Sequence, residues 1–448
     1  MTGPSGRERA GTPSGRERAS TASGRDVVLR GGTVLDAAGE RRADVLVGPD
    51  GRIAAVGLGL DATVVLDAGG CLVAPGLVDL FAQLGQPGLE DAETIAEASR
   101  AAALGGFTAV VARPDTDPPI DGAAVVREVL SLAEGACCEV RPAAALTVGM
   151  SGEQLTPMAE LAALGVRLFV DEGRGAQDAR VLRRALEYAV DLGVVVGEQP
   201  EEAALARGGC AHEGEWASRL GLPGIPAEAE ELAVMRALAL ARLTGGALHL
   251  RRLSTASSIA MAAAARAGGV AVTVSTTAQH GLLTDAALQG YDPAFRFGPP
   301  LRPEADRAAV ADALAEGRVD VLVSDHSPQP PEAKELPFDA AAPGAVGLQT
   351  VLGLALGPLG LEPARALEAL SWRPAEIAGL EGAHGGLLQV GRPANLVVLD
   401  PEARWRHDPA AGASRSRNTP FGGWELRGRV RHTLLWGEPV VVEGAARR

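Results

Sequence analysis

The feature that most constrains the fold is a regular alternation of apolar strands and alanine-rich helices between residues 75 and 379. The strands are short apolar runs, as expected where both faces of a parallel sheet are buried. Helical segments lie between them, for example at 95–107, 181–193 and 256–268. The expected strands cover residues 76–85, 107–114, 140–148, 166–173, 194–200, 247–255, 270–278 and 319–326. This order predicts an α/β chain with a (β/α)8 TIM barrel, in which chemistry takes place at the carboxyl ends of the strands.

Both ends of the chain are rich in short strands instead. Residues 27–73 contain alternating strand patterns and a turn signal at Pro49-Asp50-Gly51, and residues 394–401 and 430–443 repeat the same texture. We therefore expect the two ends to meet in one small β-sandwich. The predicted limits are a disordered tail at 1–26, a barrel at 75–385, and the two parts of the β-sandwich at 27–74 and 386–448.

Charge and composition exclude several classes of protein. The chain has 448 residues, and its 42 Lys and Arg against 56 Asp and Glu give a net charge of −14. Binding to nucleic acid or to an anionic membrane needs a basic face, so we expect neither. The four cysteines lack the paired spacing of a zinc site, and the sequence contains neither an 18-residue apolar run nor the apolar centre of a signal peptide. These features predict a cytoplasmic protein with reduced cysteines.

Many stretches of the sequence resemble dihydroorotases of the cyclic amidohydrolase superfamily. The resemblance extends from about residue 27 to residue 444 with its motifs in the family order. The matching motifs lie at 73–81, 86–96, 104–122, 212–232, 298–308, 324–329, 334–340 and 417–429. The resemblance implies a TIM barrel, a place in pyrimidine biosynthesis and hydrolysis of a ring amide. It also implies zinc at the strand ends, which lowers the pKa of a bound water and polarises the amide.

Most of the family's metal ligands are missing at the matching positions. The His-x-His motif after the first strand corresponds to Phe81 and Gln83, of which phenylalanine cannot bind metal and glutamine is a poor zinc ligand. The histidine of the fifth strand corresponds to Gly197, or to Glu198 if the alignment shifts by one residue. The histidine of the sixth strand corresponds to Arg252, whose fixed charge repels a cation. We expect the Phe81 ring to be buried against the eighth strand, where it fills the metal position.

Two acidic positions of the family are retained. Asp171 lies on the fourth expected strand, and Asp325, on the eighth, matches the family's catalytic acid/base. None of the seven histidines precedes His212, so no histidine can serve the first five strands. His249 and His326 match family positions outside the metal set, and we expect both to be packed or hydrogen-bonded.

The positions that hold the substrate in the family have also changed. The arginine and asparagine that bind the substrate carboxylate correspond to Gly85 and Asp115, which supply no cation and a like charge. The family's asparagine before Pro-Pro-Leu-Arg corresponds to Gly298. Its second histidine in the Asp-His-Ala-Pro-His motif corresponds to Gln329. The substrate site is therefore predicted to be degraded along with the metal site.

These losses favour a non-catalytic homologue that needs no cofactor. The resemblance extends to inactive dihydroorotase-like chains that act as structural subunits of an aspartate transcarbamoylase complex. It implies two kinds of partner, the aspartate transcarbamoylase catalytic chain and further copies of this chain.

The alternative is a divergent metal-dependent cyclic amidohydrolase with dihydroorotase-type ring hydrolysis. It would bind zinc, although oxygen-rich ligands suit Mg²⁺ or Mn²⁺ better than Zn²⁺. The residues that could converge on an ion are Asp171, Glu172, Glu198, Asp325 and His326. A bridging carboxylated lysine, which some family members use, is ruled out because the only lysine, Lys334, lies in a loop. If these acids bind no metal, we expect Arg252 to occupy the vacant metal position and to pair with Asp325.

Overall fold

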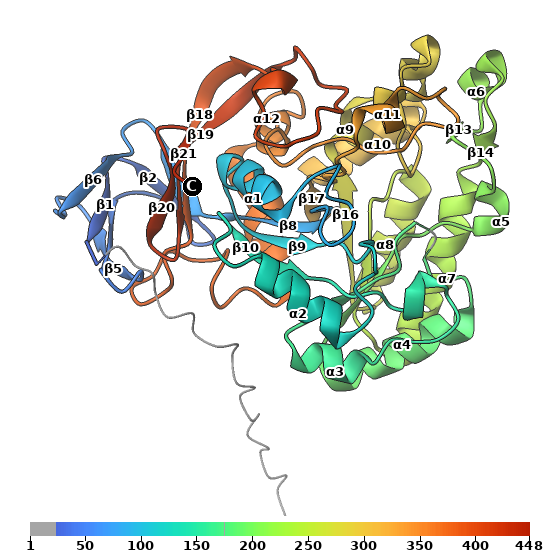
Figure 1. Cartoon of the computed structure of the whole chain (residues 1–448), viewed down its shortest axis with the longest axis horizontal. Coiled ribbons are helices and arrows are strands. Elements are labelled where there is room, and N and C mark those ends of the chain that lie inside the picture. Colours follow the sequence, from blue (N-terminus) through green and yellow to red (C-terminus); the bar gives the residue numbers. More distant parts are fainter. Residues whose placement is uncertain (1–23, 174) are drawn as a thin grey trace, which may run out of the picture.

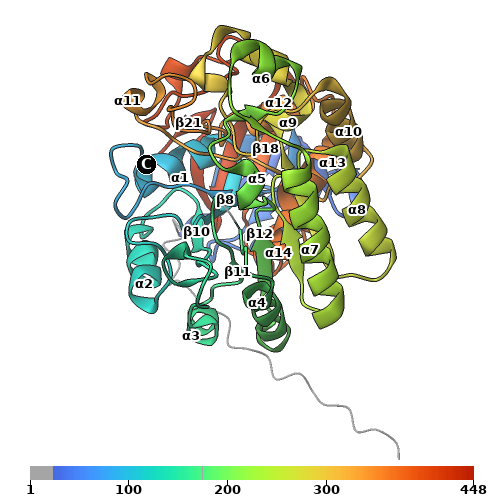
Figure 2. The ribbon, with the colours of Figure 1, turned by 90° about the vertical axis from the view of Figure 1, so that its right-hand side faces the viewer.

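The computed structural model describes residues 24–173 and 175–448 and has an α/β fold (Figure 1). The tail expected over residues 1–26 lies outside these residues, apart from its last three. The central parallel strands lie between residues 77 and 323, and helices pack on the outside of the sheets that they form (Figure 2). No helix in the described part of the chain is long and apolar enough to span a membrane.

The eight central strands expected from the sequence are all present and pair in parallel. They form a three-stranded sheet, β10-β9-β8, and a five-stranded sheet, β11-β12-β15-β16-β17. Every residue of β8 and β9 is buried, which explains why these strands read as continuous apolar runs. Their bounds are β8 Leu77–Ala82, β9 Phe107–Ala112, β10 Glu139–Pro142, β11 Leu168–Phe169, β12 Val195–Glu198, β15 Leu248–Leu250, β16 Val272–Thr277 and β17 Val321–Val323.

Local capping signals set the limits of the helices between these strands. Thr94 and Glu97 form a reciprocal capping box at the start of α1, and Gly193 ends α4 in the left-handed conformation. The helices are α1 Ile95–Leu104, α2 Ala123–Leu132, α3 Met158–Ala163, α4 Ala179–Leu192, α5 Ala203–Ala206, α6 Glu215–Leu220, α7 Glu228–Thr244, α8 Ala256–Ala267, α9 Ala278–Leu282, α10 Glu304–Ala315, α11 Pro331–Lys334, α12 Val351–Leu356, α13 Pro363–Leu367 and α14 Arg373–Ala378.

The two ends of the chain share one sheet, as the sequence predicts. β18 (Leu396–Arg406) pairs antiparallel with β7 (Leu72–Pro75), so blue and red strands lie side by side in Figure 1. The seven-stranded sheet has the order β21-β20-β19-β18-β7-β2-β3, and a four-stranded sheet, β5-β4-β1-β6, shares a hydrophobic core with it. The remaining strands are β1 Val27–Arg30, β2 Thr33–Asp36, β3 Gly39–Arg42, β4 Asp44–Val47, β5 Ile53–Gly57, β6 Val64–Asp67, β13 Ala211–His212, β14 Gly224–Ile225, β19 Glu425–Leu435, β20 Glu438–Val442 and β21 Ala445–Ala446.

Contacts between the two parallel sheets bring the carboxyl ends of their strands together. A bridge joins Ala144 to Phe169, and the backbone N–H of Gln83, after β8, donates to the carbonyl of His326, after β17. Because of these contacts, the strand ends form the place where the predicted site residues can meet.

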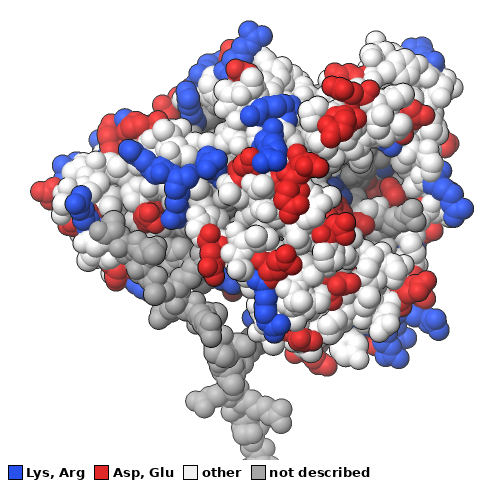
Figure 3. Space-filling view, viewed as in Figure 1, with Lys and Arg blue, Asp and Glu red and all other residues white. Residues whose placement is uncertain are grey.

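On the face of the molecule shown in Figure 3, acidic and basic side chains are interspersed.

Candidate functional site

Six charged side chains meet at the carboxyl ends of four central strands, and we refer to them as the ion cluster. Its members are Arg113 and Asp115 after β9, Glu172 after β11, Arg251 and Arg252 after β15, and Asp325 after β17. Three guanidinium groups and three carboxylates balance in charge. Their side chains are buried or nearly so, and ion pairing with hydrogen bonding offsets the cost of removing them from water.

Arg252 lies at the centre of this cluster. Its Nε donates to Gln199 Oε1 at 2.6 Å, while its two terminal nitrogens donate to Asp325 Oδ1 at 3.0 Å and to Glu172 Oε1 at 2.5 Å. The pairing of Arg252 with Asp325 that the sequence predicts is therefore confirmed. A guanidinium group carries five N–H bonds, so these three acceptors leave two for another ligand.

Glu172 joins the three arginines. It accepts from Arg251 and from Arg252 at 2.5 Å each, and Arg113 lies 3.7 Å away. Burial alone would raise the pKa of Glu172, but the three neighbouring guanidinium groups hold it well below its usual range. Glu172 is therefore ionised near neutral pH, and its hydrogen bond from Arg252 holds that guanidinium group in place.

Asp325 has both carboxylate oxygens engaged. Oδ1 accepts from Arg252, and Oδ2 accepts from Gln279 Nε2 at 2.7 Å. Its backbone has a φ of +49°, a conformation that non-glycine residues adopt only when the surrounding structure holds them there. The position of the family's acid/base is therefore tightly fixed at the end of β17.

Phe81 fills the space beside the ion cluster, as the sequence predicts. It is only 3% exposed and packs with Val321 and Val323 of β17. The Arg251 guanidinium lies 3.9 Å from its ring centroid, and the His249 ring stacks on it at 6.0 Å. Phe81 also has a positive φ of +69°. The aromatic ring therefore occupies the strand end where the family has its first two histidines.

His249 and His326 have structural partners, as expected. His249 bonds Thr273 and Ser275, and burial lowers its pKa to about 3, so it is neutral near neutral pH. His326 contacts Glu93 through Nε2 at 2.5 Å, and its Nδ1 accepts the backbone N–H of Gly347. Neither histidine belongs to the ion cluster.

Gly197 in β12 and Gln83 after β8 also lie at the strand ends where the family has metal-binding histidines. A Cβ added to Gly197 would lie 3.2 Å from Val170 and 3.4 Å from the Phe81 ring, so the ring takes the room that a histidine would need. The Gln83 side chain accepts from Ser327 Oγ at 3.2 Å and contacts no member of the ion cluster.

Asp171 and Glu198 are retained acids outside the ion cluster. Asp171 accepts the backbone N–H and the hydroxyl of Thr147, while Glu198 accepts the backbone N–H of Ala176. Burial raises the pKa of Asp171, and it raises the pKa of Glu198 from 4.5 to about 8. Both carboxyl groups are thus hydrogen-bonded to residues of nearby loops.

The predicted substrate positions differ in their surroundings. Gly85 has a φ of +74°, and a Cβ there would lie 1.9 Å from the Glu93 carbonyl oxygen, so only glycine fits. Asp115 is paired bidentately with Arg113, which largely neutralises the charge that we expected to repel an anion. The backbone N–H of Gln329 donates to Asn418 at 3.1 Å. Gly298 has open space around its missing Cβ.

Several residues at the site were not identified from the sequence. Arg113, Arg251, Gln199 and Gln279 hold the ion cluster together, and each follows the end of a strand. Listing every charged or amide side chain at those ends would have found them. Their pairings were not predicted: Arg113 bonds Asp115 only two positions away, whereas the partners of Gln279, Gln199 and Arg251 are 46, 53 and 79 positions away in the chain.

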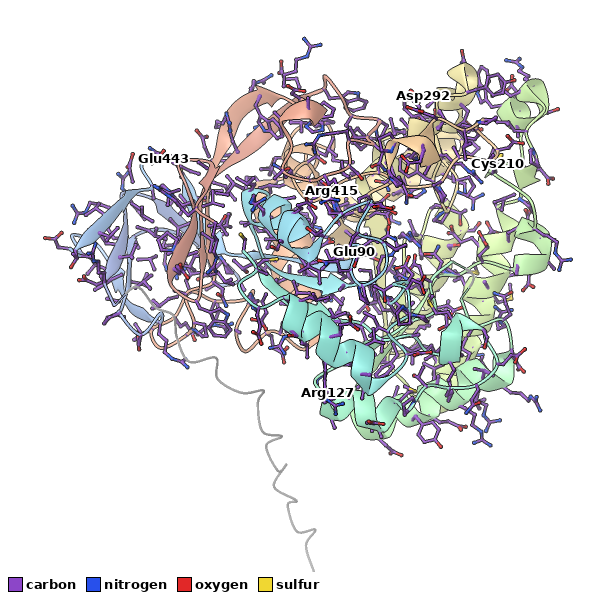
Figure 4. The ribbon with its side chains drawn as sticks, in the orientation of Figure 1. Glu90, Arg127, Cys210, Asp292, Arg415 and Glu443 are labelled. Carbon is purple, nitrogen blue, oxygen red and sulfur yellow. The ribbon has the colours of Figure 1, made fainter. Side chains whose placement is uncertain are left out.

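A second missed feature is the C-terminal segment that covers the neighbouring loop. Buried Glu93 accepts from the Ser414 hydroxyl and from the backbone N–H of Arg415. Arg415 also donates to the carbonyl of Glu90 at 2.9 Å, and Figure 4 shows the two residues close together. This segment links the C-terminal part of the chain to the loop after β8.

The zinc implied by the resemblance does not fit these residues. No group of three or more His, Cys, Asp or Glu in the described ranges could hold a metal ion. The acidic residues that we considered as alternative metal ligands do not converge on one point. Glu172 and Asp325 are paired with Arg252, whereas Asp171 bonds Thr147. The Arg252 guanidinium, a permanent cation, lies at the strand end where a ligand would be needed.

Comparisons with known proteins place the chain in a family of enzymes. A dihydro-orotase-like family model matches residues 70–258, and an amidohydrolase family model matches residues 227–440. The chain is 41% identical to a dihydroorotase of Streptomyces coelicolor over 93% of its length and 98% of the relative's. It is 42% identical to a dihydroorotase of Mycobacterium leprae over 92% of its length and 97% of the relative's.

Solved structures show the same fold. An L-hydantoinase (dihydropyrimidinase) from Arthrobacter aurescens superposes with a TM-score of 0.85 at 24% identity, covering 95% of this chain and 98% of that one. A D-hydantoinase from Bacillus sp. AR9 gives a TM-score of 0.80 at 25% identity, covering 94% of this chain and 96% of that one.

These comparisons correct three of our expectations. The expected non-catalytic subunit is wrong, because relatives about 40% identical over nearly the whole chain are named as dihydroorotases. For the same reason, the expectation that the chain is not an enzyme is wrong. The expected lack of a cofactor is contradicted by the match to amidohydrolases, whose zinc dependence the resemblance had already implied. Association with an aspartate transcarbamoylase chain stays a prediction. The chain belongs to the dihydroorotase-like branch of the amidohydrolase family.

Proposed function

We propose that this chain hydrolyses the ring amide of a small cyclic amide of the dihydropyrimidine type, with dihydroorotate as the first candidate. The observation that carries the proposal is the position of Asp325. In a chain about 40% identical to curated dihydroorotases, the acid/base position of the family retains its carboxylate at the end of β17. Arg252 and Gln279 hold that carboxylate in one orientation.

The finer architecture belongs to the same proposal. We take the two parallel sheets as arcs of one closed (β/α)8 barrel over residues 75–385, with a β-sandwich formed by residues 27–74 and 386–448. The bridge between Ala144 and Phe169 supports closure on one side, and the hydrogen bond from Gln83 to His326 supports it on the other. The shared core of the two end sheets supports the sandwich.

Protein groups at the strand ends can contribute to ring opening in two ways. Asp325 can accept a proton from the attacking water, whose oxygen bonds to the ring carbonyl carbon. When the C–N bond breaks, the same carboxyl group returns the proton to the departing ring nitrogen. The two remaining N–H bonds of Arg252 can donate to the carbonyl oxygen as it gains negative charge, and one such donor contributes about 3–4 kcal/mol in other hydrolases.

Arg113 gives the site a second fixed cation. It is buried, and its neighbours Asp115 and Glu172 raise its pKa above the usual arginine value. The charge of Arg113 is therefore permanent, although Asp115 shares it. Because Arg113 is already paired with Asp115, it attracts a substrate carboxylate less strongly than an unpaired arginine would. Uncharged dihydropyrimidines and hydantoins are therefore alternative substrates to dihydroorotate.

The test is a ring-opening assay on the purified full chain. Dihydroorotate, dihydrouracil and hydantoin are each incubated with the protein as purified, after chelation, and with added zinc or manganese, and products are separated by chromatography. Metal content is measured in parallel by mass spectrometry. We expect ring opening of at least one substrate, reduced about 100-fold or more in Asp325→Asn. The exposed Glu128→Gln variant should retain full activity.

Two outcomes would overturn the proposal. One is no ring opening of any of the three substrates under all metal conditions while circular dichroism shows folded protein. The other is ring opening that is unchanged in Asp325→Asn.

A further inference from the structure

A cavity outside the ion cluster lies between the connection from β18 to β19 and the loop before α12. It has an empty volume of about 300 Å³, part of it open to solvent. His407, Gly412 and Arg417 line it from the connection, and Gln349 and Thr350 line it from the loop. None of the described residues that line it belongs to the ion cluster. The cavity is therefore a separate place where a small molecule can bind.

Hydrogen bonds fix the two walls of this cavity against each other. Gln349 Oε1 accepts the backbone N–H of Ala413 at 2.7 Å. The carbonyl of Asn418 accepts the backbone N–H of Val346 at 2.8 Å. Because these bonds lie within the chain itself, the cavity is formed before any ligand enters it.

His407, which lines the cavity, has a buried nitrogen atom without a partner. The residue is only 7% exposed, and its Nε2 makes no hydrogen bond within the described chain. Burial lowers the pKa of His407, so the ring is neutral near neutral pH and offers one donor and one acceptor nitrogen. A buried polar atom without a partner costs free energy, and such atoms are the ones that ligands or ordered waters satisfy.

The lining carries a positive charge and no carboxylate. Arg417 is one of the described lining residues, and none of the others is Asp, Glu, Lys or Arg. Its guanidinium donates to the carbonyl of Ser416 at 3.3 Å and makes no ion pair in the part of the chain that the structure describes. Glu93 contacts the lining residues Ser414 and His326, but it is 0% exposed and is not part of the lining. In a protein of net charge −14, an unpaired arginine in such a cavity attracts an anion.

Donors and acceptors converge beside Gly412. A Cβ added to Gly412 would lie 3.7 Å from Arg417 Nη1, 3.4 Å from Gln349 Oε1 and 3.3 Å from the carbonyl oxygen of Pro409. The absence of a side chain at Gly412 thus leaves room within reach of a cationic donor and a carbonyl acceptor. An ion that both accepts and donates hydrogen bonds suits this combination better than one that only accepts.

We propose that this cavity binds inorganic phosphate in its hydrogen-phosphate form, held by Arg417 and His407. Arg417 supplies the charge, and the N–H of His407 donates to a phosphate oxygen. The hydroxyl that the free ion keeps near neutral pH donates to the carbonyl of Pro409. Sulfate has no such hydroxyl, and a phosphate monoester has lost nearly all of its second proton at neutral pH. The free ion is therefore the occupant that matches the lining.

The first test is isothermal titration calorimetry of the purified full chain with phosphate, sulfate and methyl phosphate at constant ionic strength and neutral pH. Binding there can be measured without any assay of ring opening. We expect one phosphate per chain, with sulfate and methyl phosphate at least about tenfold weaker because each leaves the Pro409 carbonyl without a donor. No binding of phosphate, or equal binding of sulfate or methyl phosphate, would overturn the proposal.

Three variants test the location. Arg417→Gln and His407→Phe should each weaken phosphate binding about tenfold or more. Gly412→Ala should also weaken it, because the residue has a φ of −65° that alanine adopts readily and the added methyl group fills the space beside Arg417. The matched controls are Arg404→Gln, whose side chain is 73% exposed, and Gly57→Ala, where a Cβ meets nothing within 4 Å; both should bind as the wild type does. Circular dichroism checks that every variant is folded.

Hydrogen exchange followed by mass spectrometry locates the ion independently of the variants. Phosphate bridges the two walls of the cavity, so amide exchange should slow in residues 346–350 and 407–417 and stay unchanged in α4. Protection that is confined to other segments, or phosphate affinity that is unchanged in all three cavity variants, would show that the ion does not bind in this cavity.

Discussion

Replacing Glu198 with glutamine should stabilise the protein, and the gain should depend on pH. The side chain is 1% exposed at the end of β12, where Oε1 accepts the backbone N–H of Ala176 at 3.1 Å. A glutamine can keep this hydrogen bond through its amide oxygen. The substitution therefore removes an ionisable group from the interior and leaves the shape of the side chain almost unchanged.

The size and sign of the effect follow from proton linkage. In the unfolded chain Glu198 has its ordinary pKa of 4.5, and burial in the folded chain raises that pKa to about 8. Between these two values the folded state binds more protons than the unfolded state, so wild-type stability falls as pH rises, by up to about 1.4 kcal/mol per pH unit from this group. The loss is absent below pH 4.5 and complete above pH 8. A shift of about 3.5 pKa units corresponds to at most about 5 kcal/mol.

The assay is urea unfolding followed by circular dichroism at pH 5, 7 and 9. We expect Glu198→Gln to match the wild type within about 1 kcal/mol at pH 5 and to exceed it by about 3–5 kcal/mol at pH 9. The exposed Glu128→Gln variant controls for loss of a carboxylate as such and should follow the wild type throughout. Equal stabilities of Glu198→Gln and wild type at pH 9 would refute the reasoning, as would a gain that is largest at pH 5.

Two further substitutions test the ion cluster and the packing beside it. Arg252→Met leaves the buried Glu172 and Asp325 without a shared partner, so the free energy of unfolding should fall by about 3–5 kcal/mol in urea, whereas the exposed Arg127→Met should change it by less than about 0.5 kcal/mol. A loss below 1 kcal/mol would mean that the cluster is not a coupled unit. Phe81→Ala removes a ring that is 3% exposed and should cost about 3–5 kcal/mol in the same assay; an effect under 1 kcal/mol would show that the ring is not packed as described.

The fold was largely predictable because its signals are local. The strands at 107–112 and 272–277 are short β-rich runs, and Thr94 with Glu97 is a capping box readable from four consecutive residues. The turn chemistry and hydrophobic periodicity agree with one another along the chain, so each element could be placed without knowledge of its neighbours. Whether the two parallel sheets close on each other depends on contacts between distant segments, which the periodicity does not contain.

The site was predictable in position but not in its interactions. The sequence placed Phe81, Arg252 and Asp325 at the strand ends, and the structure brings them there. The neutralisation of Asp115 by Arg113 was missed, because an alignment to the family compares one position at a time, whereas an ion pair depends on two. The loss of ligands at individual positions was likewise taken as loss of activity, and the high identity to dihydroorotases over the whole chain contradicts that step.

The pairing of β7 with β18 has a consequence for synthesis on the ribosome. β7 ends at Pro75 and β18 begins at Leu396, so the N-terminal strands emerge long before their neighbour in the sheet exists. At roughly 5–20 residues per second, the wait lasts about 15–60 s. During that interval the edge of β7 has unpaired backbone groups of the kind that other chains can bind. Nascent chains stalled before Leu396 should therefore recruit chaperones or aggregate, even when the central helices and strands have already formed.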